Sequence, residues 1–376
     1  MEKHSTEANP SANWAQIIFF RIYKDDIEGT RPAIKLFNNT RQRCPVRVAL
    51  VAADSNGNPV LLSEGDLRTL ELIDYITNAP LSSTLDWQVS TERGEYTWDE
   101  SMIPTVVEST DGIATGVTPL SDANREKRQG AQMVTLYVST SALSRKQVAV
   151  RIPLPSTTAH VSTNHIGVVD PDGFGDGQGR FNSSVMIEPA AFPSLDIANY
   201  GVFDSQGNLL PQPVGNTDYF YRAVEHHIHI SYNGRMLPLK SVSGSNSSIV
   251  GFSVHRTDRP FDLMKWGMTY YGQPGQAQPE HFPLAPLAKL RLTSGSEFTP
   301  GTMFNNCIGQ IVGKSTTRVV VGLIAGNLEG KFLNSSNGEI PDRIGASMYL
   351  LDDYGNYHDL TLSFGSSADK LRITIT

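Results

Sequence analysis

The sequence predicts an all-β chain of two antiparallel β-sandwich domains, immunoglobulin-like or jelly-roll-like, with long loops. Apolar residues alternate with polar ones over short runs, β-branched residues are frequent in those runs, and turn-forming residues separate them. A period of two is typical of strands that bury one face and expose the other, as in antiparallel sheets. Few segments have the spacing of apolar residues that a helix requires.

Two kinds of run are interpreted as strands. Half-buried strands are predicted where the alternation is clearest, at 134–139, 148–152, 289–293 and 371–375. Central strands are predicted where both faces are apolar, at 17–20, 48–53 and 319–324. The segment 63–73 has the best helical spacing, and Ser63 or Asp66 is placed to cap a short helix, although the same residues also suit a strand.

Segments rich in Asp, Asn and Gly are predicted to be hairpin turns, because these residues tolerate the positive φ of tight turns. They lie at 54–58, 204–208, 233–234 and 352–356. The segment 46–62, a strand followed by Asp-Ser-Asn-Gly-Asn-Pro-Val, resembles the strand and turn of bacterial immunoglobulin-like repeats, and 345–362 echoes it. The resemblance implies a sandwich fold and assigns no functional residue.

Long loop-like segments suggest the domain organisation. Compact domains seldom hold loops this long unless the loop is functional or links two domains. Such segments, rich in Gly, Ser, Asp, Thr or Pro, lie at 108–132, 155–184 and 272–286. The predicted organisation is a flexible N-terminal segment at 1–13, a sandwich at 14–154, a linker or loop at 155–184 and a second sandwich at 185–376.

Composition excludes several classes of partner. The chain has 376 residues and a net charge of -7, and its Lys and Arg residues are scattered, which weighs against nucleic acid and anionic membrane surfaces. No stretch is apolar for long enough to predict a membrane-spanning helix, and the first residues lack the apolar segment of a signal peptide. We therefore expect a cytoplasmic protein, or one secreted without a cleavable leader. Cys44 and Cys307 are expected to be buried free thiols, although a bridge between them stays open.

An acidic, glycine-rich loop is the first candidate metal site. Asp170, Asp172 and Asp176 are closely spaced and separated by glycines, an arrangement that lets a short loop wrap a calcium ion with oxygen ligands. The third acidic position and the closing Glu of the helix-loop-helix calcium motif are absent. The alternative is a turn-rich linker.

The histidine cluster is the second candidate metal site. On a strand, His227 and His229 share one face and His226 takes the other. Two imidazoles on one face can hold zinc or copper if a neighbouring strand supplies a third ligand such as His255. The alternative is a strand with exposed histidines.

Sequence motifs for catalysis are weak. Gly-x-Ser-x-Gly does not occur, and the loop at 309–316 has three residues between its glycines where a phosphate-binding loop has four. Because no catalytic constellation stands out, we expect a non-enzyme. Aromatic residues in polar surroundings are candidate ligand-binding residues that could stack on sugars or anchor a protein, the alternative being core packing: Trp87, Trp98, Tyr270 and Tyr271.

The functional hypothesis is a binding or structural protein that presents loops of two sandwiches to a macromolecular partner, either a protein or a glycan surface. The alternatives are a lectin-like protein with a calcium loop, a metal-dependent hydrolase, and a β-rich protein that self-assembles or forms pores through its strand edges. A homo-oligomer is compatible with the first and last of these. Calcium is the one cofactor that the sequence suggests.

Overall fold

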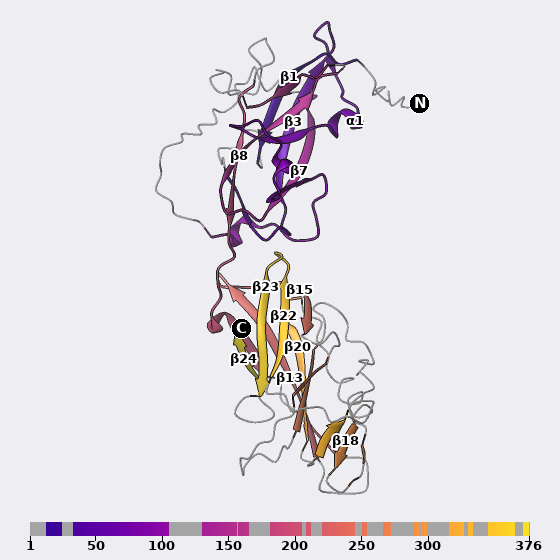
Figure 1. Ribbon diagram of the computed structural model, residues 1–376, viewed down its shortest axis with the longest axis vertical. Coiled ribbons are helices and arrows are strands. Elements are labelled where there is room, and N and C mark those ends of the chain that lie inside the picture. Colours follow the sequence, from indigo (N-terminus) through magenta and orange to yellow (C-terminus); the bar gives the residue numbers. More distant parts are fainter. Residues whose placement is uncertain are drawn as a thin grey trace, which may run out of the picture. The chain divides into compact units, whose positions relative to one another are not determined.

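The computed structural model describes residues 13–24, 33–104, 130–155, 157–164, 181–204, 208–211, 220–244, 250–253, 266–271, 289–292, 295, 297–298, 316–326, 330–333, 345–364 and 371–375. Over these residues the chain forms strands β1–β24, one short α-helix and three 3-10 turns, in mostly antiparallel sheets (Figure 1). The predicted all-β sandwich class is confirmed. The chain divides into two compact units, Met1–Pro193 and Ser194–Thr376.

The first unit contains two five-stranded sheets. One has the order β1-β3-β7-β6, with β4 paired to β3, and consists of β1 (Gln16–Tyr23), β3 (Cys44–Ala53), β4 (Pro59–Val60), β6 (Trp87–Ser90) and β7 (Gln132–Thr140). The other has the order β2-β10-β8-β5, with β9 paired to β8, and consists of β2 (Ala33–Phe37), β5 (Glu71–Asp74), β8 (Lys146–Pro153), β9 (His160–Ser162) and β10 (Val185–Ala190). The pair β2 and β10 is parallel, and the other pairs of this unit are antiparallel.

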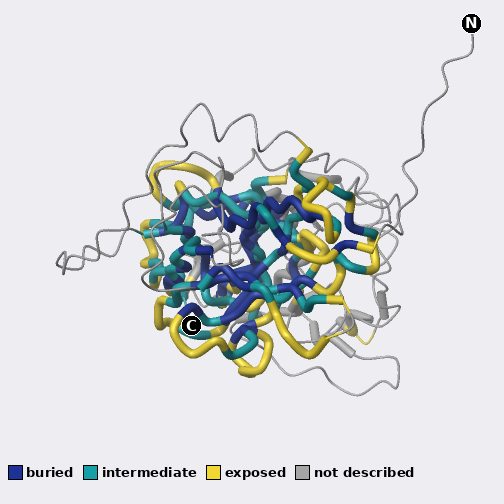
Figure 2. The backbone as a smooth tube through the Cα atoms, turned by 90° about the horizontal axis from the view of Figure 1, so that it is seen from above, coloured by how far each residue is buried: buried dark blue, intermediate teal, exposed yellow. Residues whose placement is uncertain are grey.

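The core of the first unit lies between its sheets. Phe20 and Val48 come from one sheet, and Ile34 and Val150 from the other, and all four are fully buried. Phe181 packs edge-on against Phe20, with their ring centroids 5.8 Å apart. Figure 2 shows the buried stretches of the backbone in dark blue and the exposed stretches in yellow, and many of the exposed stretches are turns.

Strands β1 and β3 are apolar on both faces because both faces are buried. Their outer face is also buried, by a second cluster of Phe19, Tyr23, Ala49 and Val51. The prediction that 17–20 forms a central strand is nevertheless wrong over the described part of the chain, where β1 is the last strand of its sheet. The predictions for 48–53 and 319–324 are confirmed, since β3 and β20 (Val319–Gly326) each lie between two neighbours.

The segment 63–73 forms a short helix and then the start of a strand, and its sequence suits both structures. Ser63 caps the helix α1 (Glu64–Leu67), accepting a hydrogen bond from the Asp66 backbone N–H at 3.1 Å. The Asp66 carboxylate accepts the Ser63 backbone N–H in return, at 3.0 Å. This reciprocal capping satisfies two N–H groups at the start of the helix. The rest of the segment leads into strand β5.

The division between the units falls later than the sequence predicts. Strand β10, which the prediction assigned to the second sandwich, pairs with β8 and β2 of the first unit. It completes the second sheet of that unit, and the structure divides after Pro193. A linker composition at 155–184 therefore does not mark the boundary.

The second unit contains three sheets. The largest has the order β11-β13-β20-β17-β16, with β12 and β14 paired to β13; its strands besides β20 are β11 (Tyr200–Asp204), β12 (Asn208–Pro211), β13 (Phe220–Tyr232), β14 (Arg235–Met236), β16 (Val250–Ser253) and β17 (Trp266–Tyr271). A second has the order β15-β22-β23-β24, with β15 (Leu239–Gly244), β22 (Gly345–Asp352), β23 (Tyr357–Phe364) and β24 (Leu371–Ile375). The third has the order β19-β18-β21, with β18 (Lys289–Leu292), β19 (Glu297–Phe298) and β21 (Gly330–Leu333).

Three of the four predicted hairpin turns are confirmed. Strands β3 and β4 pair across 54–58, β13 and β14 across 233–234, and β22 and β23 across 352–356. The prediction at 204–208 is wrong. Strands β11 and β12 do not pair with each other, because both pair with β13, one after the other along its length.

Candidate functional site

The histidine cluster lies on β13, between β11 and β20. His226 is fully buried and His229 is 9% exposed, so the alternative of exposed histidines is wrong for both. His229 lies opposite Gly201 of β11, and its ring occupies the space that a Cβ atom on Gly201 would need. Burial, and then the charge of Arg318, lower the pKa of His229 below its ordinary value. The ring is therefore packed closely against the backbone of β11, in surroundings that favour its neutral form.

The metal hypothesis for His227 and His229 has no third ligand in the part of the chain that the structure describes. Within that part, no group of three or more His, Cys, Asp or Glu side chains is placed to hold a metal ion. His255 lies outside the described residues, as do Asp170, Asp172 and Asp176. The zinc and calcium sites both stay predictions.

A buried polar cluster that the sequence reasoning did not find lies at the hairpin between β22 and β23. The Asp352 carboxylate is fully buried and lies 3.1 Å from Nε2 of His358. The Tyr200 hydroxyl lies 3.3 Å from Nδ1 of the same ring, and burial is the main cause that raises the pKa of Tyr200 to about 12. Asp352 also accepts backbone N–H groups of its own turn, from Tyr354 and Asn356. The hydrogen bonds of this cluster hold the hairpin turn in place. The part of the cluster that can be recognised in the sequence is the turn motif at 352–356.

The candidate aromatic residues are not exposed where the structure describes them. Trp87 is 3% exposed and belongs to the core of the first unit. Trp98 packs against that core, and its indole N–H donates to the Lys35 carbonyl at 2.8 Å. Core packing, the alternative to ligand binding, therefore accounts for Trp87, and the half-buried Trp98 packs against the same core. Tyr270 and Tyr271 lie in β17, and their side chains are outside the described part.

Cys44 is a buried free thiol, as predicted. Burial is the main cause that raises its pKa to about 12, which removes the thiolate needed for nucleophilic chemistry. Cys307 lies outside the described residues. Of the helices that the structure describes, none is long and apolar enough to cross a membrane.

The most exposed large apolar side chains of the first unit include three in loops, namely Ile76, Leu85 and Leu143, at 76%, 100% and 62% exposure. We call these three the apolar loop surface. They follow the end of β5, precede the start of β6 and follow the end of β7. The start of β6 lies opposite the end of β7, where Trp87 pairs with Thr140, and the end of β5 lies opposite the start of β8, where Asp74 pairs with Val148. The loops that carry the three side chains therefore lie at the same end of the first sandwich.

Hydrogen bonds hold two of these loops against each other. The Asp86 carbonyl accepts the Ser141 backbone N–H at 2.9 Å and the Thr140 hydroxyl at 2.7 Å. The Asp86 carboxylate accepts the Ser141 hydroxyl at 3.2 Å. Leu85 and Leu143 flank these bonds in sequence, so the loops that carry them are fixed together.

The third loop is fixed by Asp74. Its carboxylate accepts the backbone N–H groups of Ile76 and Thr77 at 3.0 and 2.9 Å, and lies 3.5 Å from the Lys146 ammonium group. Burial acts to raise the pKa of Asp74, but the bonds from Thr77 and Ile76 and the charge of Lys146 outweigh it and lower that pKa. The Lys146 ammonium group also lies 5.7 Å from the Trp87 ring centroid. The turn that presents Ile76 is thereby attached to β8 and to the core.

Comparison with known proteins assigns no function to this chain. No known family and no curated protein matches the sequence. Among solved structures it is similar to the C-terminal domain of the Streptococcus pyogenes antigen I/II-family protein AspA, with 11% identity, coverage of 97% of this chain and 100% of that chain, and a TM-score of 0.18. It is also similar to the C-terminal domain of the Streptococcus agalactiae AgI/II polypeptide BspA (8% identity, 95% and 99% coverage, TM-score 0.18). A third is the collagen adhesin CNA of S. aureus (10% identity, 98% and 97% coverage, TM-score 0.18). Superpositions this loose match no residue to another, so the functional argument rests on this chain's own side chains.

Proposed function

We propose that this chain is a non-enzymatic binding or structural protein that presents loops of its first sandwich to a macromolecular partner. The observation that carries the proposal is the apolar loop surface of Ile76, Leu85 and Leu143, which is exposed while its loops are fixed by hydrogen bonds. Large apolar side chains gathered at one place on a surface are typical of interaction sites. Loops that are already ordered lose little conformational entropy on binding, which favours affinity.

The chemistry of this surface favours a protein over a glycan. Two leucines and an isoleucine offer no aromatic ring for stacking on a sugar, whereas exposed apolar surface is typical of sites that bind proteins. The hydrogen bonds of Asp352 and Asp74 support a structural role for these two carboxylates. Asp352 holds a hairpin turn and Asp74 holds a loop, rather than facing a substrate.

Photo-crosslinking tests the proposal. A photoreactive phenylalanine analogue replaces Leu85, and in a matched control it replaces Tyr357, which is 58% exposed in the second unit. Both versions of the full chain are irradiated with protein from the native source. We expect a discrete crosslinked protein at position 85 that is absent at position 357, and that is lost when Ile76→Asp and Leu143→Asp are added.

The same experiment separates the alternatives. A crosslink between two copies of this chain would identify the partner as the chain itself. Equal crosslinking at both positions, or crosslinking that survives the two Asp substitutions, would overturn the role of the apolar loop surface. Because all the substituted side chains are exposed, unfolding by urea should be unchanged, and this measurement controls for misfolding.

A further inference from the structure

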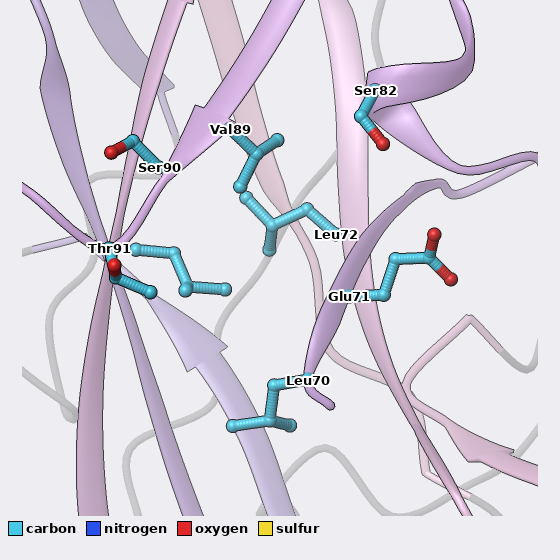
Figure 3. A pocket seen from close by; sticks show the side chains of 8 residues that line it. Leu70, Glu71, Leu72, Ser82, Val89, Ser90 and Thr91 are labelled. Atoms are coloured by element: carbon cyan, nitrogen blue, oxygen red, sulfur yellow. The ribbon is translucent and has the colours of Figure 1, made fainter. Parts of the chain in front are cut away.

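A small cavity opens between the edge strands of the two sheets of the first unit. Its volume is about 220 Å³. Its walls are apolar. Leu70 and Leu72 form the wall on the side of β5, and Val89 and Leu136 form the wall on the side of β6 and β7. Figure 3 shows Leu72 and Val89 directed toward each other across the cavity, while the Glu71 carboxylate points away from it. The cavity therefore lies in the apolar interior of the sandwich, at the side where each sheet ends among the strands that the structure describes.

The lining of the cavity also includes polar side chains. Three of them carry hydroxyl groups, namely Ser82, Ser90 and Thr91. The carboxylate of Glu71 is engaged with Arg151, whose Nη2 lies 2.6 Å away on the outer face of the sheet. The cavity thus has apolar walls with hydroxyl groups in its lining, and the one charged residue of that lining, Glu71, is paired with Arg151. It suits an uncharged, apolar group that enters from a polar surface.

Strand β6 borders this cavity and is the last strand of its sheet among the strands that the structure describes. Thr140 and Ser139 of β7 lie opposite Trp87 and Gln88. The Trp87 N–H is directed away from β7, since it donates to the Thr84 carbonyl at 3.3 Å. Backbone groups alternate in direction along a strand, so Val89, two residues on, directs its N–H and C=O away from β7 as well.

Val89 therefore combines two features. Its side chain forms a wall of the cavity, and its backbone N–H and C=O lie on the outer edge of β6, where a further strand would pair. The facing edge, on β5, is partly covered, because Ile73 forms a bridge with Pro80. Proline has no N–H to offer to an incoming strand. The geometry favours addition of a strand to β6 rather than to β5.

We propose that the outer edge of β6 and the adjacent cavity bind an extended apolar peptide segment as an added strand. The backbone of the segment pairs with Val89, and one of its side chains, of leucine or phenylalanine size, enters the cavity between Leu72 and Leu136. An apolar cavity of about 150 Å³ holds benzene, so the volume here is sufficient for such a side chain. In strand addition the backbone bonds supply affinity, and pockets for alternate side chains supply specificity.

This site goes beyond the proposed function, because it is separate from the apolar loop surface and recognises a different feature of a partner. The loop surface offers side chains to a folded protein, whereas β6 offers backbone groups to an extended chain. The experiments are independent. Neither the peptide nor the variants below touch Ile76, Leu85 or Leu143.

A peptide titration tests the proposal. The probe is the acetylated and amidated peptide Thr-Leu-Thr-Leu-Thr, added to the full chain labelled with ¹⁵N-valine. We expect the Val89 amide signal to shift on titration and its hydrogen exchange to slow at least tenfold at saturation, because the amide gains a hydrogen-bond acceptor. The same peptide with every amide N-methylated should not bind, because it cannot donate to the Val89 carbonyl.

Variants locate the site. Leu70→Phe fills the cavity from its wall and should weaken peptide binding at least tenfold. Val89→Pro removes the N–H at the outer edge while leaving the bonds of Gln88 and Ser90 to β7. This variant should abolish peptide binding. Gln88→Ala, an exposed change on the same strand, is the control and should bind as the wild type does.

Two outcomes overturn the proposal. Equal binding of the N-methylated peptide would show that the cavity takes apolar groups without strand pairing. A Val89 amide that neither shifts nor gains protection at saturating peptide would show that β6 accepts no strand. Both outcomes are read on the wild-type chain, so they decide the matter even if Val89→Pro does not fold.

Discussion

Asp54 and Asp352 occupy the same position in the hairpin turns of the two units, yet only Asp352 is buried. Each carboxylate accepts the backbone N–H groups two and four residues later, at 2.8 and 2.9 Å for Asp54 and at 2.9 and 2.8 Å for Asp352. In each turn a glycine three residues after the Asp has a positive φ, 86° at Gly57 and 88° at Gly355. One local sequence motif therefore forms one turn geometry in two different environments.

Replacing Asp352 by Ala should destabilise the second unit by about 3 kcal/mol, because buried N–H groups and the His358 ring lose their acceptor. Asp54→Ala removes equivalent bonds in an exposed turn, where water replaces them, and should cost clearly less. Urea unfolding of each variant, followed by a probe in each unit, measures both changes. Equal losses would contradict the role assigned to burial.

Replacing Gly201 by Ala should destabilise the second unit by about 1–3 kcal/mol through overpacking, because the His229 ring occupies the space of the new methyl group. The prediction has an internal control. In the background His229→Ala the ring is gone, so Gly201→Ala should then cost little. A double-mutant cycle from thermal unfolding gives the coupling, and additive losses would show that the ring is not the obstacle.

Acid should weaken the second unit through His229. Burial, and then the charge of Arg318, lower its folded-state pKa below the ordinary histidine value of about 6.5, so the unfolded chain binds a proton more readily than the folded chain does. The contribution of His229 is therefore fully present above about pH 6.5, decreases as the pH falls below it, and levels off below the folded-state pKa. Thermal unfolding between pH 8 and pH 5 should show this decrease in the wild type and less of it in His229→Gln. Identical profiles would refute it.

The acidic loop and the histidine pair are tested by metal titration. Calcium that binds Asp170, Asp172 and Asp176 in the folded state alone would add ~2.7 kcal/mol at a hundred times its dissociation constant, visible as a rise in melting temperature. Asp172→Asn should abolish that rise. Zinc is tested in the same way against His227→Ala. Melting curves unchanged by both metals would remove both sites from consideration.

Local patterns predicted strands and turns well where the local sequence decides them. The alternation at 134–139 and 148–152 became β7 and β8, and Ser63 caps the one described α-helix as expected. The turn at 204–208 carries the same Asp-x-x-Gly-Asn motif as 54–58, but its flanking strands both pair with β13. Pairing partners are chosen by long-range contacts, which the motif does not contain.

The candidate site shows the same limit. Ile76, Leu85 and Leu143 are unremarkable in sequence, because exposure of an apolar residue depends on which loops meet at one end of the sandwich. Trp87, a predicted ligand-binding residue, is buried because its strand places it inward. The cavity beside Val89 requires two strands from different sheets, and no local pattern encodes their proximity.

The sequence by itself determined the all-β class, most strand positions and the chemistry of the turns. These follow from alternation and backbone conformational preference, which act over a few residues. The tertiary structure alone decided which strands are edges, that β10 belongs to the first unit, and which side chains are exposed or buried. Burial and pairing are properties of segments far apart in the chain, so they are settled only when the sheets pack together.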